Sequence, residues 1–213
     1  MKHLIPTLAG LTFFLILSSC TAQTSKKGPD ARISLNPPTG KAIAVFAEGC
    51  FWCSEHIFEA VVGIDSAVSG YAGGTTANPT YELVNTETTG HAESVLVYYD
   101  PKVIGYAELL KVFFTSQDPT THDRQGPDQG NSYRSIIFYK TTEEKALAEQ
   151  AKKDFAKSFR NPIVSEIKLL TAFYKAEGYH QNYIEHNPYS SYVRGVSIPR
   201  FELFKRTYKG KLK

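Results

Sequence analysis

The sequence predicts an α+β protein in which helices and one mixed β-sheet form a two-layer α/β sandwich. Short runs that are apolar or rich in Val, Ile and Tyr alternate along the chain with amphipathic runs of helical period. The part with this alternation, residues 41–213, has the size of one domain. We expect at least one strand to run antiparallel to its neighbours, which makes the sheet mixed.

The strands are expected where a short run is apolar or rich in β-branched and aromatic residues. Residues 42–46, for example, have the length and composition of a buried strand. The expected strands span residues 41–47, 64–71, 91–99, 133–139 and 163–173.

The helices are expected where apolar residues recur at helical spacing or follow a start signal. Pro79 opens a short helix that carries Tyr81, and Thr141 with Glu144 has the spacing of a capping box. The other expected helices span residues 50–61, 106–116, 141–160 and 176–185, and the chain beyond them is expected to be irregular.

Residues 117–132 are polar and rich in turn-forming Gly, Pro, Asp and Asn, although they lie inside a compact domain. Loops of this length are usually either functional or disordered. Because the segment leads into an apolar strand at Tyr133, we expect an ordered loop.

The N-terminus has the features of a secretory signal. Lys2 supplies a positive charge, and residues 4–17 are largely apolar but too short to span a bilayer. Small residues then precede Cys20, as in a bacterial lipobox. We expect a signal peptide at residues 1–19, lipid on Cys20 as the first mature residue, and a flexible tether at residues 20–40. The alternative is an ordinary signal with a chance cysteine, or an uncleaved anchor.

This N-terminus predicts an exported protein that is lipid-anchored to the bacterial cell envelope, facing the periplasm or the cell surface. The charge is nearly balanced, because 24 Lys and Arg against 21 Asp and Glu give +3. Removal of the signal peptide takes away only Lys2 and leaves +2. Nothing in this balance indicates nucleic acid as a partner.

Cys50 and Cys53 form the most informative pair in the chain. They are two of only three cysteines, too few for a disulfide scaffold, and they lie between an expected strand and an expected helix. Gly49 lets the backbone bend there, and a helix N-terminus favours thiolate over thiol. Cα atoms three positions apart on a helix are about 5 Å apart, inside the disulfide range of roughly 4.4–6.8 Å. The pair can therefore open and close without a large backbone movement.

Other interpretations of this pair stay open. Two cysteines can be buried simply as small apolar residues. His180 and His186 could complete a zinc site, but they lie far along the chain and the pair supplies only two thiols. A haem attachment motif is excluded, because Ser54 rather than His follows the second cysteine.

Glu93 is the candidate proton donor. In the strand expected at residues 91–99, alternation places Glu93 on the same face as Val95 and Val97. If that face is the core, burial raises the pKa of Glu93 and keeps the carboxyl protonated near neutral pH. The alternative is a solvated carboxylate at an exposed strand end.

Six motifs follow one another over about residues 41–195. They are Gly49-Cys50-Phe51-Trp52, Gly70-Tyr71-Ala72-Gly73-Gly74, Asn78-Pro79-Thr80-Tyr81, Gly90-His91-Ala92-Glu93, Gln125-Gly126-x-Asp128-x-Gly130-x-x-Tyr133-Arg134-Ser135 and Tyr179-His180-Gln181. Together and in this order they resemble the peptide methionine sulfoxide reductase A family.

The resemblance implies a fold with a ferredoxin-like core and an enzyme that reduces the S epimer of methionine sulfoxide. The substrate is free methionine sulfoxide or an oxidised protein or peptide. In the reaction that it implies, Cys50 attacks the sulfoxide sulfur and becomes a sulfenic acid. Glu93 gives a proton to the oxygen, assisted by hydrogen bonds from Tyr81 and Tyr133.

The resemblance also implies a binding site. Phe51 and Trp52 would hold the S-methyl group in an apolar pocket, and Asp128 would bind near the substrate or help to position the tyrosines. The chemistry needs neither a metal nor an organic cofactor. His180 is interpreted as a packed, hydrogen-bonded histidine outside the catalytic set.

The chain departs from the family pattern at Cys53, where the family usually has Gly. Many members carry a resolving cysteine in a C-terminal tail, but no cysteine follows Cys53 here. Cys53 is therefore the expected resolving thiol, which forms a disulfide with Cys50. Because cytosolic thioredoxin does not reach an exported enzyme, the expected reductant is a thioredoxin-like domain outside the cytosol.

A thioredoxin-like thiol-disulfide oxidoreductase is the alternative function, since a strand, a Cys-x-x-Cys pair and a helix occur there too. Against it, the pair follows the first core strand directly and the downstream motifs match the other family. A third hypothesis is a lipoprotein that binds a ligand without catalysis.

Overall fold

The computed structural model describes Met1 and residues 31–213. The predicted signal sequence, the lipid on Cys20 and the tether up to residue 30 lie outside the described residues. Across the described residues, the structure has no helix that combines the length and the apolar character needed to cross a bilayer.

Six strands form one mixed sheet in the order β7-β6-β1-β3-β2-β8. Neighbouring strands are antiparallel except for β6 and β7, which run parallel. The strands are β1 (Ala42–Glu48), β2 (Ile64–Ala72), β3 (Ala92–Tyr99), β6 (Ser135–Tyr139), β7 (Glu166–Leu169) and β8 (Phe173–Lys175), with β4 (Arg124–Gln125) and β5 (Asp128–Gln129) paired separately. The predicted α+β class with a mixed sheet is confirmed.

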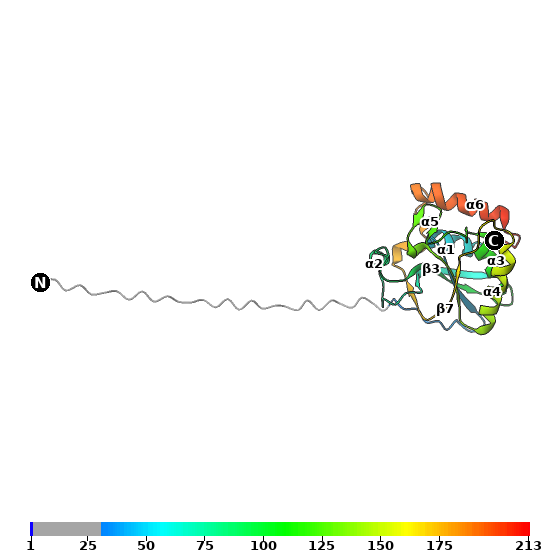
Figure 1. Cartoon of the computed structure of the whole chain (residues 1–213), viewed down its shortest axis with the longest axis horizontal. Coiled ribbons are helices and arrows are strands. Elements are labelled where there is room, and N and C mark those ends of the chain that lie inside the picture. The colour runs from blue at the N-terminus through cyan, green and yellow to red at the C-terminus, as the bar shows by residue number, and fades with distance from the viewer. Residues whose placement is uncertain (2–30) are drawn as a thin grey trace.

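Helices α1 and α3 cover one face of this sheet, and α6 lies outside α1 (Figure 1). Phe46 of β1 packs between Phe58 of α1, at 5.1 Å between ring centroids, and Phe113 of α3, at 5.5 Å. The helices are α1 (Phe51–Glu59), α2 (Tyr81–Val84), α3 (Tyr106–Thr115), α4 (Thr142–Ala156), α5 (Tyr183–His186) and α6 (Ile198–Thr207). The short turns are η1 (Asn131–Tyr133), η2 (Gly178–His180) and the π-helical η3 (Val193–Ser197).

The opposite face of the sheet has a smaller apolar cluster. Ile43 and Leu96 belong to it, and Ile33 and Leu35 from the segment before β1 pack against it. Extended chain, rather than a second layer of helices, therefore packs on this face, and the two-layer arrangement follows.

The segment before β1 corrects one prediction. Ile33 donates its backbone N–H to the Phe173 carbonyl at 2.9 Å, and Lys175 donates to the Ala31 carbonyl at 2.8 Å. The prediction of a flexible tether over residues 20–40 is therefore wrong for residues 31–35. Composition alone missed that alternate apolar residues can dock on a sheet edge.

The strand predicted at residues 163–173 splits into β7 and β8, which form the two opposite edges of the sheet. The Leu170 N–H donates to the Tyr139 carbonyl at 2.8 Å, after which the chain leaves that edge. An apolar run does not show where a chain crosses from one edge to the other, because both strands have the same pattern.

The C-terminal part differs most from prediction. The helix expected at residues 176–185 is broken into η2 and α5, since Asn182 between them is left-handed at φ +50°. The irregular chain expected beyond it contains η3 and α6 instead. Pro199 lies directly after the π-helical turn η3, from which α6 continues without a break.

The end of the chain is docked rather than free. Lys213 donates its N–H to the Ala60 carbonyl at 2.8 Å, and Val62 donates to the Lys211 carbonyl at 3.0 Å. The Phe201 ring of α6 packs edge-on against His56 of α1 at 4.5 Å. These contacts hold α6 and the end of the chain against the last turn of α1.

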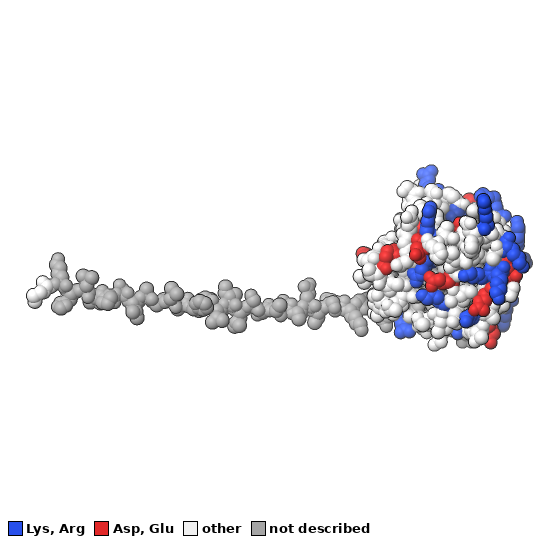
Figure 2. Space-filling model, in the orientation of Figure 1, with Lys and Arg blue, Asp and Glu red and all other residues white. Residues whose placement is uncertain are grey.

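Acidic and basic side chains are interspersed on the face shown in Figure 2. Next to the start of β1, the Lys41 ammonium lies 2.9 Å from the Asp65 carboxylate and 3.6 Å from that of Asp100. Such exposed pairs contribute little to stability, about 0–1 kcal/mol each.

Candidate active site

The predicted strand-to-helix turn is present at Gly49 and Cys50. β1 ends at Glu48, Gly49 has φ +84°, and Cys50 is the N-cap residue of α1. A Cβ atom on Gly49 would lie only 2.4 Å from Cβ of Gln125, so both backbone conformation and packing require glycine. The turn therefore holds Cys50 at the start of a helix packed against the sheet.

Cys50 lines a cavity of about 340 Å³, which we call the Cys50 cavity. Its walls are formed by Cys50, Phe51, Trp52, Tyr81, Glu93, Asp128, Tyr133, Tyr183 and Tyr192. The structure thus brings together every predicted catalytic and substrate-binding residue except Cys53. It adds Tyr183 and Tyr192, which sequence reasoning missed.

Glu93 is buried at the bottom of this arrangement, only 2 % exposed, on the helix-covered face that it shares with Val95 and Val97. Its Oε2 accepts the backbone N–H of Phe51 at 3.0 Å. Burial raises the pKa of Glu93 to about 8, although this hydrogen bond acts in the opposite direction. The carboxyl is therefore mostly protonated at neutral pH, as the strand alternation predicted.

Tyr81 and Tyr133 are held in the cavity by two other carboxylates. The Glu177 carboxylate accepts the backbone N–H of Tyr81 at 2.9 Å, at the start of α2. The Glu87 carboxylate accepts both the N–H, at 3.0 Å, and the hydroxyl, at 2.8 Å, of Ser132 in η1, directly before Tyr133. Burial raises the pKa of both tyrosines, so both hydroxyls keep their protons and can donate hydrogen bonds.

Trp52 forms an aromatic wall with three partners. Its indole stacks on Tyr183 at 3.6 Å between centroids and 7° between planes, and Tyr192 approaches it edge-on at 5.7 Å. The indole Nε1–H donates to Nδ1 of His180 at 3.0 Å. The stacking on Tyr183 and the hydrogen bond to His180 together fix the orientation of the Trp52 ring.

His180 acts through Trp52 and does not line the cavity. Because Nδ1 accepts a hydrogen bond, the ring proton of the neutral form resides on Nε2, and burial lowers the pKa of His180. Its interpretation as a packed, hydrogen-bonded histidine is confirmed. Within residues 31–213, no group of three or more His, Cys, Asp and Glu side chains is placed to hold a metal ion.

Asp128 comes from β5, in the loop that we predicted to be ordered. Its Oδ2 accepts the hydroxyl of Tyr192 at 2.5 Å, and burial raises its pKa. Asp128 thus positions a tyrosine of the cavity, but that tyrosine is Tyr192 and not one of the two expected from the motifs.

The cysteine pair is reduced and buried. The helix N-terminus was expected to favour the thiolate of Cys50, but burial, together with a hydrogen bond to Cys53, raises the pKa of Cys50 well above its usual value. The same hydrogen bond, together with the charge of Arg200, lowers the pKa of Cys53 to about 6 despite burial. The interaction between the two thiols therefore disfavours a thiolate at Cys50 and favours one at Cys53.

Cys53 lines a different cavity, of about 430 Å³, which we call the Cys53 cavity. Its walls include Arg200 and Leu203 of α6 and Gln125 of β4. The hydrogen-bonded residues Asp128 and Tyr192 line both cavities and so form a wall between them.

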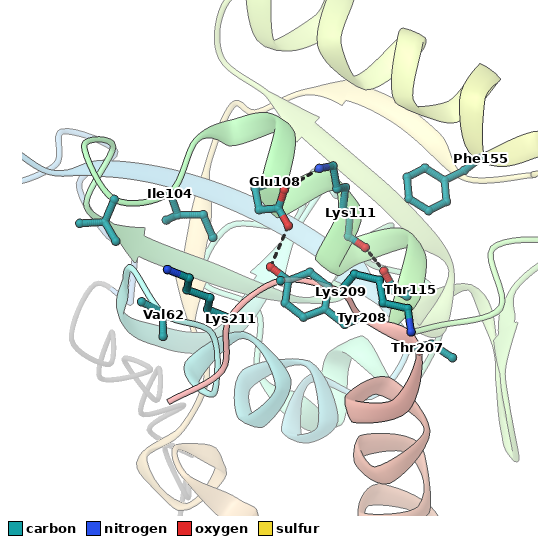
Figure 3. A pocket seen from close by; sticks show the side chains of 12 residues that line it. Val62, Ile104, Glu108, Lys111, Thr115, Phe155, Thr207, Tyr208, Lys209 and Lys211 are labelled. Carbon is teal, nitrogen blue, oxygen red and sulfur yellow. Dashed lines mark hydrogen bonds and ion pairs between the residues drawn. The ribbon is translucent and has the colours of Figure 1, made fainter.

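A larger cavity, of about 650 Å³, lies between α3 and the C-terminal segment (Figure 3). There Glu108 binds both Lys111, at 2.7 Å, and the hydroxyl of Tyr208, at 3.0 Å. None of the predicted site residues lines it. Cavity size therefore does not identify the site in this molecule, whereas the chemistry of the lining does.

Comparison with known proteins decides the family. The family model for peptide methionine sulfoxide reductase matches residues 42–212. The chain belongs to this family. It is an oxidoreductase that reduces methionine sulfoxide, and its activity is one of protein repair.

Relatives match over most of their length. The chain is 44% identical to peptide methionine sulfoxide reductase MsrA 1 of Rhodopirellula baltica over 174 residues, which covers 82% of this chain and 91% of the relative. It is 48% identical to MsrA of Leptospira borgpetersenii, over 77% of this chain and 93% of the relative.

Solved structures match as well. Mxr1 of Saccharomyces cerevisiae in reduced form superimposes with a TM-score of 0.69 at 33% identity, covering 74% of this chain and 94% of that one. Methionine sulfoxide reductase A of Corynebacterium diphtheriae gives 0.66 at 31% identity, covering 76% and 84%.

Sequence reasoning missed the contributions of the C-terminal third. Tyr183 and Tyr192 are two of 13 tyrosines, and neither belongs to a recognised motif. Arg200 is one charged residue in a region that we predicted to be irregular. No local pattern distinguishes these residues, because their role arises only from the folding of α5, η3 and α6 against α1.

Proposed function

We propose that the enzyme reduces the S epimer of methionine sulfoxide, free or in oxidised proteins, with Cys50 as nucleophile and Glu93 as acid. The observation that supports this assignment most directly is the shared cavity. A cysteine, a buried protonated carboxyl and two tyrosine hydroxyls line the same space, next to an aromatic wall. That set places a nucleophile and proton donors around the polar sulfoxide group of the substrate, and the aromatic wall offers a surface for its apolar methyl group.

In the first step, the Cys50 thiolate attacks sulfur and takes over its oxygen. Cys50 first loses its proton to solvent, because the thiolate is the form that attacks. Glu93 gives a proton to the oxygen, while Tyr81 and Tyr133 donate hydrogen bonds to it. Methionine leaves, and Cys50 becomes a sulfenic acid.

The methyl group and the rest of the substrate would be distinguished by the aromatic wall. Phe51 and Trp52 line the apolar part of the cavity, and Tyr183 fixes the indole plane. Only one epimer can direct its oxygen at Glu93 while its methyl group contacts this wall. Epimer choice thus follows from placing an acid and an apolar surface on different sides of one sulfur.

In the second step, Cys53 resolves the sulfenic acid. Its thiolate attacks Cys50 sulfur, the S–O bond breaks, the oxygen takes up a proton and leaves as water, and a Cys50–Cys53 disulfide forms. The interaction between the two side chains, which shifts the pKa of each, supports this pairing. The Cys-Phe-Trp-Cys segment would then carry both redox-active thiols.

A dithiol protein of the thioredoxin type would restore the enzyme. Support comes from Mxr1 of Saccharomyces cerevisiae, whose structure in complex with Trx2 superimposes on this chain with a TM-score of 0.51 at 26% identity. Two electrons pass from the dithiol to the disulfide, and the reductant itself becomes a disulfide.

The remaining proposals concern location and fold. The signal sequence at residues 1–19 and the lipid on Cys20 would place the enzyme and its reductant at the bacterial cell envelope. We also propose that the strands β6-β1-β3-β2, joined through α1 and α3, form the ferredoxin-like core. These strands carry Glu93 and end at Cys50, so this core would be the rigid base of the site.

The test is turnover of the purified protein on the separate S and R epimers of a blocked methionine sulfoxide, with dithiothreitol as reductant. We expect reduction of the S epimer only, and its loss in Cys50→Ser. Cleavage of insulin disulfides without turnover of either epimer would instead identify the thioredoxin-like alternative. Activity on the R epimer would contradict the proposed placement of Glu93 and Trp52.

A further inference from the structure

Arg200 of α6 is held in place beside the start of α1, although the proposed reaction at Cys50 does not use it. Its Nε donates to the Ser116 carbonyl at 2.7 Å. One Nη2 donates both to the Glu48 carbonyl at 2.9 Å and to its carboxylate at 3.1 Å. With 13% of its side chain exposed, the guanidinium is both buried and fixed in direction.

The partner of Arg200 is a completely buried carboxyl. Glu48 also accepts the hydroxyl of Ser116 at 2.7 Å, and burial raises its pKa to about 7 even though Arg200 lowers it. A buried ion pair often costs as much in desolvation as it returns in attraction. Stability therefore does not explain why Arg200 and Glu48 are paired here. Their position next to the cysteines indicates a role in the reaction of the cysteines.

α6 and the turn before it direct two polar groups to Cys53. Arg200 lines the same cavity as Cys53. Ser197, three positions earlier, has its Oγ 3.3 Å from the Cys53 sulfur, in hydrogen-bond contact. When Cys53 is a thiolate, the hydroxyl of Ser197 can reverse and donate to it. A cation and a hydroxyl therefore face Cys53, whereas an acid and two tyrosines face Cys50.

We propose that Arg200 is a positioning residue for the resolving step, which holds Cys53 as the thiolate that attacks the sulfenic acid. This inference rests on the proposed function, in which Cys53 is the resolving thiol. In the step, the Cys53–Cys50 S–S bond forms and the S–O bond of Cys50 breaks. The oxygen leaves as water with a proton from solvent, so the Cys53 sulfur is oxidised while the Cys50 sulfur is reduced from the sulfenic acid to the disulfide level.

The charges around Cys53 explain why a fixed cation is needed. Asp128 and Glu48 lie close enough for their negative charge to disfavour a Cys53 thiolate, and the Glu93, Tyr192 and Cys50 side chains are near as well. The charge of Arg200 acts in the opposite direction. Without it, Cys53 would face acids from three different strands.

The first experiment measures the thiolate of Cys53 directly. In the full chain with Cys20→Ser and Cys50→Ser, Cys53 is the only thiol, and its alkylation rate by iodoacetamide against pH gives its titration midpoint. Arg200→Gln should raise that midpoint by about 1–2 pH units. Glu48→Gln, which removes the opposing charge, should lower it, and the double variant should lie between the two.

This order of midpoints distinguishes an effect of the Arg200 charge from a loss of packing. If Arg200 serves only the packing, both single variants shift the midpoint in the same direction and the double variant shifts it furthest, which would overturn the proposal. Arg200→Lys keeps the charge and should stay near the parent value. Arg134→Gln is the matched control, because that side chain is equally buried, at 13% exposed, but pairs with Glu166. It should leave the midpoint unchanged.

A second experiment separates this inference from the proposed function. With the natural cysteines and one addition of sulfoxide at pH 6.5, Arg200→Gln should form about one methionine per enzyme at the parent rate but close the Cys50–Cys53 disulfide about tenfold more slowly. An unchanged rate of closure would refute the role of Arg200 alone. Absence of the disulfide in the parent protein would refute the proposed role of Cys53 instead.

Discussion

The two cysteines of one short motif occupy different chemical surroundings. Cys50 faces a cavity with a protonated carboxyl, tyrosines and an indole, whereas Cys53 faces a cavity with a guanidinium and a serine hydroxyl. The Tyr192–Asp128 pair forms part of both walls. The two thiols, three residues apart, have opposite pKa shifts: burial raises the pKa of Cys50, whereas the interaction with Cys50 and the charge of Arg200 lower the pKa of Cys53.

The comparison suggests a division of labour. The Cys50 side has what is needed to protonate and hold a sulfoxide, and its groups come from β3, η1, α2 and the start of α1. The Cys53 side has what is needed to stabilise a negative sulfur, and its groups come from η3 and α6. Reduction of the substrate would therefore take place on the Cys50 side of the first turn of α1, and resolution of the sulfenic acid on the Cys53 side.

The largest effect is expected from Cys50→Ser. A hydroxyl at this position is a far weaker nucleophile, so formation of methionine should fall to the background rate. The measurement is methionine released from the S epimer by single-turnover chromatography. An unchanged melting temperature serves as the control for folding, and remaining activity would mean that Cys53 can act as the nucleophile and that the two sides are interchangeable.

Glu93→Gln should come next, with a decrease in the first-turnover rate of about 10²–10⁴-fold. The amide keeps the shape and can accept the Phe51 N–H, but it supplies no acidic proton. Because burial raises the pKa of Glu93 to about 8, the parent rate should decline above pH 8, where the carboxyl loses its proton. That decline should be absent in the variant, and a decline that persists would assign the acid to another group.

Cys53→Ser should leave the reaction at Cys50 intact and abolish the resolving step. We expect about one methionine per enzyme at a rate near that of the parent, followed by arrest when only a thioredoxin-type protein is supplied. Mass spectrometry should then find a sulfenic acid on Cys50 and no intramolecular disulfide. Full turnover with the protein reductant would show that resolution does not need this thiol.

The smallest effect is expected from Tyr192→Phe, which alters the wall between the cavities. Loss of one hydrogen bond to Asp128 amounts to about 0.5–1.5 kcal/mol, so both half-reactions should slow by less than about tenfold. Rapid-quench rates of methionine formation and of disulfide closure can be compared in one sample. A large effect on a single half-reaction would place Tyr192 in that half alone.

The Cys50 side was largely readable from the sequence. Alternation in one strand placed Glu93 on the face of Val95 and Val97, and Gly49 marked the bend before Cys50; both expectations are confirmed. Such local patterns are readable because a strand and a helix start impose short, regular constraints on neighbouring residues. The same reasoning was wrong for β7 and β8, which we predicted as one strand, because a single apolar run contributes to two opposite edges of the sheet.

By itself, the sequence determined the class of fold and the strand-to-helix turn, and it proposed the reactive residues, because these depend on patterns within a few residues. Only the tertiary structure decided which thiol is stabilised as an anion. The pKa shifts of the two thiols depend on their mutual interaction and on the charge of Arg200, which is 150 residues from Cys50 in the chain and reaches the site through the packing of α6 on α1. Burial and charge at a site are sums over neighbours in space, and a linear pattern does not record those neighbours.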